Sequence, residues 1–296
     1  MPRAVLVTGA TGQVGTELQR CVWPEGWVVV AVGRETLDLR DTAAIEALVA
    51  SRPWAAVINA AAYTAVDKAE TEPVEAWKVN ALAPAALAAA CAKGGIPLVH
   101  VSTDYVFAGD RSGPWDVDDP VGPLGVYGAS KLAGELAVRT SGARHAIVRT
   151  AWIVSPHGNN FVKTMLRLAG EREVLRVVSD QHGSPTSAAD LARVLMTIAV
   201  RLAEDEAAPT GVFHFSNAGE TTWAGFATEI FRQSASRGGP AAAVESIATA
   251  DYPTLARRPA NSLLSHRAIR QAYDVAPRPW QDALGEILGP LIGAMQ

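Results

Sequence analysis

The sequence predicts an α/β protein built on a doubly wound parallel sheet, with a smaller lobe in its C-terminal part. In the first half, short β-branched runs alternate with helical patterns, and a glycine motif at 9–15 directly follows the first run. After Thr150 the rhythm changes, because loops lengthen and proline becomes frequent. Continuous apolar strands alternating with helices are typical of a parallel sheet that is covered on both faces.

The expected strands of the first half are Ala4–Val7, Val28–Val32, Ala56–Asn59, Leu98–Ser102 and Ala146–Arg149. Between them, helical patterns predict helices near Val14–Val22, Thr42–Ala50, Val74–Ala92 and Ser130–Thr140. This order of elements gives each strand a helical crossover to the next, as a parallel sheet requires.

The second half is expected to form a discontinuous lobe. A helical pattern over Ala188–Leu202 and an apolar run at Val212–Ser216 predict that the chain returns to the main sheet. A dinucleotide-binding domain would then comprise residues 1–150, rejoined by about 187–217, and residues 151–296 would mainly form a substrate-binding lobe. The Gly/Ser/Ala-rich stretch Gln233–Ala243 is expected to be a surface loop.

Composition excludes several functional classes. The chain has 296 residues, of which 49% are hydrophobic and 19% charged, and its net charge is −4 without a Lys/Arg block. We therefore expect no nucleic-acid partner, and no apolar run reaches the length of a membrane span. Cys21 and Cys91 lie in apolar, helical-looking stretches, as buried reduced thiols do, and no signal peptide is expected. These features predict a cytoplasmic protein.

The glycine motif predicts a Rossmann-type dinucleotide site. Gly9, Gly12 and Gly15 follow a strand and open a helix, which is the context that the dinucleotide fingerprint requires. Glycines allow backbone N–H groups to approach a diphosphate, and the helix dipole favours its charge. A simple strand-to-helix turn is the alternative.

The residue after the second strand bears on the choice of cofactor. An NAD-specific enzyme often carries an acidic residue there, whereas this chain has Arg34, which suits a 2′-phosphate. The sequence thus favours NADPH, with NADH possible, since Arg34 could also stack on adenine or lie in solvent. Asp38 and Leu39 could flank the adenine or belong to a surface loop.

Tyr127 and Lys131 are four residues apart, so on a helix they share a face. A lysine cation beside a phenol is expected to lower the phenol's pKa and make it a better proton donor. A surface Tyr/Lys pair is the alternative. Thr103 and Asp104 follow an apolar strand, at the edge of the sheet where ligands bind in open α/β folds. Combined with the glycine motif, these residues predict a nicotinamide-dependent carbonyl reductase.

Several phrases of the sequence resemble the extended short-chain dehydrogenase/reductases and, within them, the dTDP-4-dehydrorhamnose reductases. The resemblance covers nearly the whole chain. It is carried by the phrases at Thr8–Gly15, Asn59–Glu70, Ser102–Phe107, Tyr127–Lys131, Arg149–Trp152, Asn159–Val162, Asp180–Thr186 and Arg258–Ser262.

The resemblance implies a set of site residues. Catalysis would fall to Thr103, Tyr127 and Lys131. Cofactor contacts would come from Gly9, Thr11, Gly12, Gln13, Val14, Arg34, Asp38, Leu39, Ala61, Ala62, Tyr63 and Thr64, together with Tyr127 and Lys131. The sugar nucleotide would contact Thr103, Asp104, Trp152, Asn160 and Arg258. Trp152 could instead be a hydrophobic plug between the lobes, and Arg258 could belong to a solvated arginine pair.

Two positions depart from the family's usual phrases, namely Ala108, where Asp is usual, and Trp115–Val117, where Tyr-x-Glu is usual. Both are expected near the rim of the pocket. Some family members are dimers bridged by Mg²⁺, and Glu17 and Asp190 could supply part of such a site. The chain ends in Ala-Met-Gln without an acidic residue, so no metal is predicted, and a homodimer remains possible.

The resemblance implies NADPH-dependent reduction of the C4 keto group of dTDP-4-dehydro-6-deoxy-L-mannose to dTDP-L-rhamnose, the last step of dTDP-L-rhamnose biosynthesis. Two alternatives stay open. The substrate could be another nucleotide-linked 4-keto-6-deoxysugar, or the protein could be a non-catalytic, dinucleotide-binding regulatory subunit. The complete set of Thr103, Tyr127 and Lys131 argues against the second.

Overall fold

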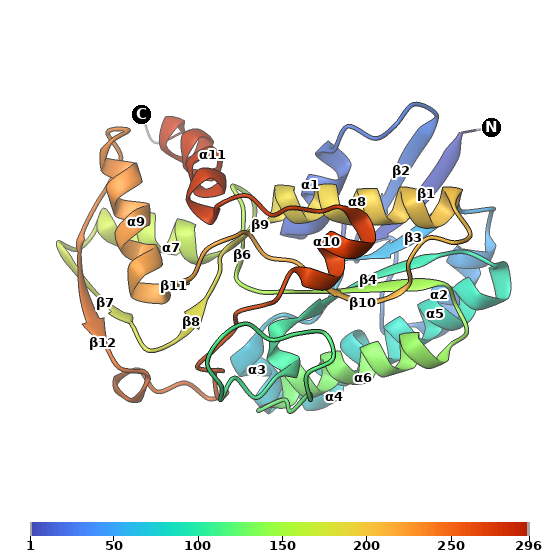
Figure 1. Ribbon diagram of the computed structural model, residues 1–296, viewed down its shortest axis with the longest axis horizontal. Coiled ribbons are helices and arrows are strands. Elements are labelled where there is room, and N and C mark those ends of the chain that lie inside the picture. The colour runs from blue at the N-terminus through green and yellow to red at the C-terminus, as the bar shows by residue number, and fades with distance from the viewer. Residues whose placement is uncertain (1, 295–296) are drawn as a thin grey trace.

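The computed structural model describes residues 2–294 and is organised around a six-stranded parallel sheet (Figure 1). Met1, Met295 and Gln296 lie outside the described residues. Two of the three residues of the Ala-Met-Gln end considered above are therefore not described. The strand order is β10-β5-β4-β3-β1-β2. These strands span Arg3–Thr8 (β1), Trp27–Val32 (β2), Ala56–Asn59 (β3), Leu98–Thr103 (β4), His145–Thr150 (β5) and Gly211–His214 (β10). The predicted fold class is confirmed.

The order of the strands locates a crevice. The chain runs from β1 to its neighbour β2 at one edge and then crosses to β3 on the other side of β1. Helices that follow these strands consequently pack on opposite faces of the sheet. In an open parallel sheet, ligands bind where the strand order reverses, outside the carboxyl ends of the strands. Here that place lies beyond Thr8 and Asn59.

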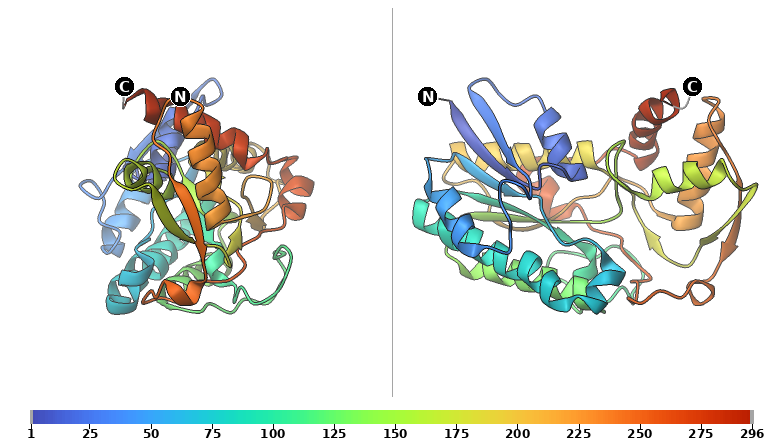
Figure 2. Two further views of the ribbon diagram at one scale, coloured as in Figure 1. Left: turned by 90° about the vertical axis from the view of Figure 1, so that its left-hand side faces the viewer. Right: turned by 180° about the vertical axis from the view of Figure 1, so that it is seen from behind.

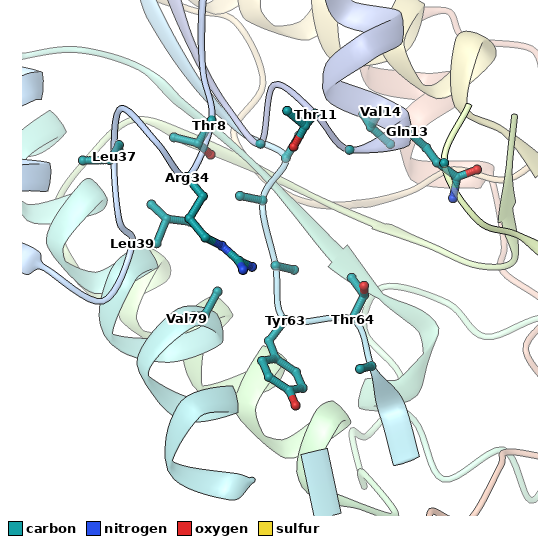
Figure 3. A pocket seen from close by; sticks show the side chains of 18 of the residues that line it. Thr8, Thr11, Gln13, Val14, Arg34, Leu37, Leu39, Tyr63, Thr64 and Val79 are labelled. Atoms are coloured by element: carbon teal, nitrogen blue, oxygen red, sulfur yellow. The ribbon is translucent and has the colours of Figure 1, made fainter. Parts of the chain in front are cut away.

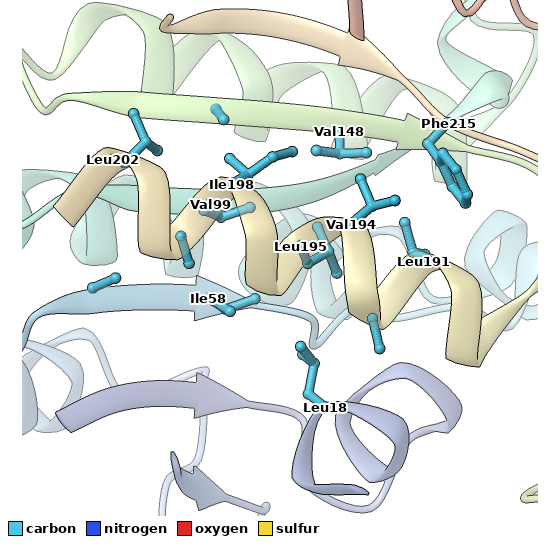
Figure 4. Packing of buried hydrophobic residues seen from close by; sticks show 14 of the residues in the cluster. Leu18, Ile58, Val99, Val148, Leu191, Val194, Leu195, Ile198, Leu202 and Phe215 are labelled. Atoms are coloured by element: carbon cyan, nitrogen blue, oxygen red, sulfur yellow. The ribbon is translucent and has the colours of Figure 1, made fainter. Parts of the chain in front are cut away.

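One face of the sheet is covered by α1 (Gln13–Arg20), α8 (Ala188–Glu204) and α10 (Arg267–Tyr273). Figure 4 shows Leu195 and Ile198 of α8 lying over Ile58, Val99 and Val148 of three neighbouring strands. All five side chains are fully buried. Burial of a leucine or isoleucine side chain stabilises a fold by about 1.5–3 kcal/mol, so this layer fixes the sheet beneath the crevice.

The opposite face is covered by α2 (Thr42–Ala50), α5 (Ala83–Gly94) and α6 (Val126–Thr140). Leu6 and Val57 point to this side, whereas Val5 and Val7 point to the other, because side chains alternate along a strand. Near the carboxyl ends of the strands lie two short helices, α3 (Val66–Thr71) and α4 (Pro73–Trp77).

Two predicted helices need correction. The stretch Val74–Ala92 is not one helix, because a π-helical turn, η1 (Lys78–Leu82), separates α4 from α5. The side chain of Asn80 in that turn hydrogen-bonds the backbone of Tyr63 outside the helix, and single π-helical turns often occur at functional sites. The helix predicted from Ser130 begins earlier, at Val126, so Tyr127 lies in its first turn.

The remaining elements form a smaller lobe at the carboxyl end of the sheet (Figure 2). Its core lies between α7 (Phe161–Ala169), α9 (Trp223–Ala235), α11 (Trp280–Gly293) and the parallel pair β7 (Val174–Val178) and β12 (Ala243–Ile247). Short pairs join β6 (Ile153–Val154) to β9 (Thr186–Ser187) and β8 (His182–Gly183) to β11 (Thr221–Thr222). The 3-10 turns are η2 (Asp104–Val106) and η3 (Thr249–Asp251).

The predicted loop Gln233–Ala243 is too long, because α9 continues through Ala235 and β12 begins at Ala243. The helix and strand expected to return to the main sheet are present as α8 and β10, and α10 also packs on that sheet. The division into two domains stays a prediction. Among residues 2–294, no helix has the length and apolar character needed to cross a membrane.

The two cysteines are free thiols. Cys91 is buried within α5, where desolvation raises the pKa of its thiol to about 12. Cys21 was expected inside a helix, but α1 ends at Arg20 and Cys21 follows it, half-buried.

Candidate active site

A cleft of about 840 Å³ opens beyond the carboxyl ends of β1, β2 and β3 (Figure 3). Its far wall comes from the second half of the chain, through Ile153, Gly158 and Asn159. The cleft brings together every residue that the sequence associated with the dinucleotide alone: Gly9, Thr11, Gly12, Gln13, Val14, Arg34, Asp38, Leu39, Ala61, Ala62, Tyr63 and Thr64.

The glycine turn is shaped by close backbone contacts. Gly9 has a φ of +82°, and a Cβ there would lie 3.0 Å from Ala61. A Cβ on Gly15 would lie 2.0 Å from the Gly9 carbonyl oxygen, so no side chain fits without moving the turn. Gly12 is the N-cap of α1 and supplies no side-chain hydrogen bond to it. The N–H groups of the first turn are therefore free to bind an anion, and a dinucleotide diphosphate fits this cradle.

Arg34 and Asp38 differ in how they are engaged. Arg34 is exposed, extends between the loops that carry Leu39 and Tyr63 (Figure 3), and makes no ion pair within residues 2–294. Asp38 instead pairs with Arg40 at 2.6 Å, and hydrogen bonds from Arg40 lower the pKa of its carboxyl to about 2. The unpaired guanidinium of Arg34 is thus the cation available to a phosphate in this part of the cleft.

The loop after β3 is held by two buried amide side chains that the sequence analysis missed. Asn59 accepts a hydrogen bond from the Thr8 hydroxyl at 2.7 Å and contacts the His100 ring at 3.0 Å. Asn80 bonds both the N–H and the carbonyl of Tyr63, at 2.8 and 3.1 Å. In the sequence, Asn80 could have been noticed as a polar residue directly before an alanine-rich stretch.

A second cavity of about 330 Å³ continues from the first, sharing Gln13, Val14, Ala60–Ala62, Thr64, Ile153 and Asn159 with it. It brings together the candidates Thr103, Asp104, Tyr127, Lys131, Trp152 and Asn160. They come from the end of β4, the segment after it, the first turns of α6 and the segment after β5. A small molecule in this cavity would lie directly beside one bound in the cleft.

Lys131 is almost fully buried, and its Nζ donates a hydrogen bond to the Val101 carbonyl at 2.7 Å. Burial lowers the pKa of the ammonium group to about 8, against an opposing effect of Glu135 one turn along α6. Lys131 is therefore mostly charged at neutral pH and loses its charge as the pH rises through about 8.

The expected lowering of the Tyr127 pKa is wrong for this structure. Burial raises the pKa of the phenol to about 12, and only a hydrogen bond with Thr103 acts in the opposite direction. Desolvation of the phenolate exceeds any stabilisation by a lysine whose Nζ is bound to a backbone carbonyl. The phenol consequently keeps its proton at neutral pH.

Thr103 and Asp104 lie side by side at the end of β4. The Thr103 hydroxyl donates to the Asp104 carboxylate at 3.0 Å and accepts from the Tyr105 N–H at 3.2 Å. Burial raises the pKa of Asp104 to about 6, while hydrogen bonds from Ser262 and Thr103 act against this rise. Asp104 is mostly ionised at neutral pH and can accept further hydrogen bonds.

Trp152 lies between the second cavity and the smaller lobe. It lines the second cavity, and its ring stacks on Trp223 of α9 at a centroid distance of 3.6 Å. Its φ of 48° is unusual for a residue with a side chain, and such strained backbone often occurs at functional sites. Trp152 is therefore a wall of the cavity that is braced by the smaller lobe.

Asn160 and Arg258 are engaged with protein groups. The Asn160 amide donates to the Gln13 side chain at 3.0 Å and to the Ser155 carbonyl at 2.8 Å, while Asn160 also lines the second cavity. Arg258 lines neither cavity, and its guanidinium bonds Asp67 at 2.7 Å. The structure thus does not bring Arg258 together with the other substrate candidates.

The departures Ala108 and Trp115 also lie away from the cavities. Neither residue lines them, and Trp115 is buried, stacked on Phe107 at 4.6 Å. The expectation that both lie at the pocket rim is therefore not met, because the aromatic ring of Trp115 is part of a hydrophobic cluster.

Within this chain, Glu17 and Asp190 are engaged with basic side chains. Glu17 contacts His157 at 3.2 Å, and Asp190 pairs with Arg193 and Arg278. Across residues 2–294, no group of three or more His, Cys, Asp or Glu side chains could hold a metal ion.

The sequence analysis also missed a buried ionic network beneath the second cavity. Glu135 and Arg149 form two hydrogen bonds, at 2.9 and 2.7 Å, and both side chains are almost inaccessible to water. Ser102 donates to Glu135 at 2.5 Å, and Arg149 contacts His214 at 3.4 Å. The network ties α6 to β4, β5 and β10. These residues come from separate segments of the chain, so their burial and pairing are visible only in the folded structure.

The doubly wound sheet, the glycine turn and the adjoining Tyr/Lys pocket together define a dinucleotide-dependent oxidoreductase of the short-chain dehydrogenase/reductase class. Comparison with known proteins identifies the family. The chain belongs to the RmlD substrate binding domain family, whose model matches residues 3–292.

Relatives of the same length support this assignment. The dTDP-4-dehydrorhamnose reductase of Sinorhizobium fredii is 41% identical over 287 residues, covering 97% of each chain. That of Escherichia coli is 41% identical over 292 residues, again covering 97% of each.

Solved structures agree with these sequence relatives. A dTDP-4-dehydrorhamnose reductase from Clostridium acetobutylicum is 37% identical, with a TM-score of 0.91 over 97% of this chain and 99% of that one. The enzyme from Bacillus anthracis, solved in complex with NADP, is 36% identical, with a TM-score of 0.89 and the same coverage.

Proposed function

We infer that the protein reduces the C4 keto group of dTDP-4-dehydro-6-deoxy-L-mannose to dTDP-L-rhamnose, with NADPH as the reductant. The observation that carries this inference is the continuity of two cavities, one built by the glycine turn and one lined by Thr103, Tyr127 and Lys131. Full-length similarity to dTDP-4-dehydrorhamnose reductases supports the choice of sugar nucleotide.

The dinucleotide, when bound, supplies the hydride that adds to C4. The first turn of α1 would hold its diphosphate through backbone N–H groups, beginning beyond Gly12. The exposed guanidinium of Arg34 would bind the 2′-phosphate, which favours NADPH over NADH. The small side chains Ala61 and Ala62 leave room for the cofactor along the end of β3.

Tyr127 would donate the proton to the C4 oxygen. Because its pKa is raised to about 12, the phenol is protonated at neutral pH, which is the form that a ketone reduction consumes. Thr103, which acts to lower the Tyr127 pKa and lines the same cavity, would orient the same oxygen. The Lys131 cation would stabilise the phenolate that remains after proton transfer, since an opposite charge nearby favours the ionised form.

The sugar nucleotide would occupy the second cavity. The Asp104 carboxylate would accept hydrogen bonds from sugar hydroxyls, Trp152 would cover an apolar face of the sugar, and Asn160 would contact it beside Gln13. A direct contact of Arg258 with the diphosphate would require the guanidinium to leave Asp67, so we assign Arg258 to the surroundings of the site instead.

The test is NADPH oxidation with enzymatically prepared dTDP-4-dehydrorhamnose, followed by NMR of the product. Formation of dTDP-L-rhamnose is expected. Oxidation with other nucleotide-linked 4-keto-6-deoxysugars, but not with this one, would assign the site to a different sugar. Dinucleotide binding with no turnover on any keto-sugar would favour the regulatory role. A homodimer and a cytoplasmic location stay predictions.

A further inference from the structure

The short helix α3 (Val66–Thr71) contains part of the family phrase Asn59–Glu70, yet it carries none of the residues assigned above to the reaction. It lies between the cofactor loop, which it directly follows, and the first turn of α6 (Figure 1). Its two acidic side chains bind different partners, Glu70 the start of α6 and Asp67 a segment of the second half of the chain.

Glu70 holds the start of α6. The N-cap of α6 is Gly125, which provides no side-chain hydrogen bond to the helix. Glu70 takes over this function, because its Oε1 accepts the Val126 N–H at 2.8 Å. A Cβ on Gly125 would lie 2.5 Å from that Oε1, so the absence of a side chain at 125 makes the contact possible. The next residue is Tyr127.

Other contacts confine the same turn of α6. A Cβ on Gly128 would lie 2.2 Å from the Tyr105 carbonyl oxygen, so the helix packs directly on that backbone. The Ser130 hydroxyl donates to the Tyr127 carbonyl at 2.8 Å. The Val126 N–H has no partner in its own helix and depends on Glu70.

Asp67 holds a strap from the second half of the chain, which we define as Ala256–Arg258. Its Oδ1 accepts the Ala256 N–H at 3.1 Å and its Oδ2 accepts the Arg258 Nη2 at 2.7 Å. Ala256 is buried, and the Arg258 side chain is 19% exposed. The chain continues from this strap to the buried Ser262, which acts to lower the pKa of the Asp104 carboxyl in the second cavity.

We propose that α3 is a positioning clamp, in which Glu70 sets the place of the proton donor Tyr127 and Asp67 sets the substrate side of the cavity through the strap. The proposal rests on the proposed function. Neither carboxylate lines the second cavity, so both act through other residues. Misplacement of a reacting group by about 1 Å can cost about 10²-fold in rate, so a clamp of this kind affects turnover without touching substrate.

The first experiment compares Glu70→Ala, Glu70→Gln and the control Glu46→Ala, which removes an exposed acid from the unrelated helix α2. Glu70→Ala is expected to lower kcat about 10–100-fold while the Kd of NADPH and the melting temperature stay near those of the control. It should also raise the isotope effect on kcat with NADPH deuterated at the transferred hydrogen. Glu70→Gln keeps an acceptor oxygen and should retain most of the activity.

A readout that needs no substrate separates this proposal from the proposed function. Loss of the Glu70 bond should speed hydrogen exchange in peptides covering 125–131 about tenfold, and not elsewhere, in the NADPH-bound protein. If wild-type protein fails to reduce the sugar nucleotide but this local exchange appears, the proposed function fails and the clamp stands. Exchange and kcat equal to those of Glu46→Ala would overturn the clamp.

The second experiment tests the strap with Asp67→Ala and Arg258→Ala, alone and combined. Each is expected to raise the KM of the sugar nucleotide several-fold with little change in kcat or in the Kd of NADPH, and the double variant should be no worse than either single one. Additive effects, or an equal loss of NADPH affinity, would contradict a shared action of these two residues on the substrate side.

Discussion

The two adjoining cavities are built in different ways. The larger cleft is formed mainly by backbone, at the glycine turn and the alanine loop, with exposed polar side chains at its edge. The smaller cavity is formed by side chains, and Lys131, Thr103 and Asp104 in it are nearly inaccessible to water. A backbone cradle binds a diphosphate through N–H groups, which do not titrate, whereas the buried ionisable groups of the smaller cavity have shifted pKa values and can exchange protons.

If the smaller cavity performs the chemistry, removing its proton donor should have the largest effect. Tyr127→Phe keeps the ring but lacks the hydroxyl, so kcat should fall by about 10²–10⁴-fold, with the Kd of NADPH little changed. NADPH oxidation at 340 nm measures the rate and fluorescence titration the binding. Turnover near the wild-type rate would remove Tyr127 from the mechanism.

The buried lysine predicts a pH dependence. The pKa of Lys131 is lowered to about 8, so its charge is present below that pH and lost above it. If the Lys131 cation stabilises the phenolate left after proton transfer, as we propose, kcat should fall as the pH rises through 8, by about tenfold per unit. In Lys131→Arg, whose guanidinium stays charged, the activity that remains should be flat over this range. A flat wild-type profile to pH 10 contradicts the assignment.

NADPH binding in the larger cleft should be weakened by a methyl group added at Gly15 but not by one added at Gly33. Gly15→Ala puts a Cβ 2.0 Å from the Gly9 carbonyl oxygen and must displace the turn. We expect the Kd of NADPH to rise by about tenfold or more, since the donors no longer converge on the diphosphate. Gly33→Ala meets nothing closer than Thr11 at 3.6 Å and serves as the control. Equal affinities for both variants would argue against the glycine cradle.

The edge of the cleft should affect the choice of cofactor and little else. Arg34→Ala should weaken NADPH binding about tenfold, as expected for the loss of one charged contact, and leave NADH binding unchanged. Arg40→Ala is the matched control, because Arg40 already pairs with Asp38 and Glu75. The measurement is the ratio of the Kd of NADH to the Kd of NADPH in each variant. A parallel loss of NADH affinity in Arg34→Ala would assign Arg34 to another part of the dinucleotide.

The larger cleft was predictable in more detail than the smaller cavity. Gly9, Gly12 and Gly15 act within one local turn, so their spacing describes both the motif and its geometry. In the smaller cavity the candidates Thr103, Tyr127 and Lys131 were identified, but the direction of the Tyr127 pKa shift was wrong. Burial depends on how β4, α6 and the segment after β5 pack, and spacing along the chain does not report it.

Arg258 shows the same limit. Its guanidinium suits a diphosphate chemically, yet Asp67, 191 positions away, binds it. Likewise, the role of Gly125 is evident only beside Glu70, because the glycine leaves room for a carboxylate from another helix.

The sequence by itself determined the doubly wound sheet, the glycine turn and the Tyr/Lys pair, because periodicity and short motifs act over a few neighbouring residues. Tertiary structure alone decided which charged groups are buried, which cations are already paired, and how α3 links the first turn of α6 to the strap. These properties depend on desolvation and on contacts between residues far apart in the chain, and both arise only when the layers pack together.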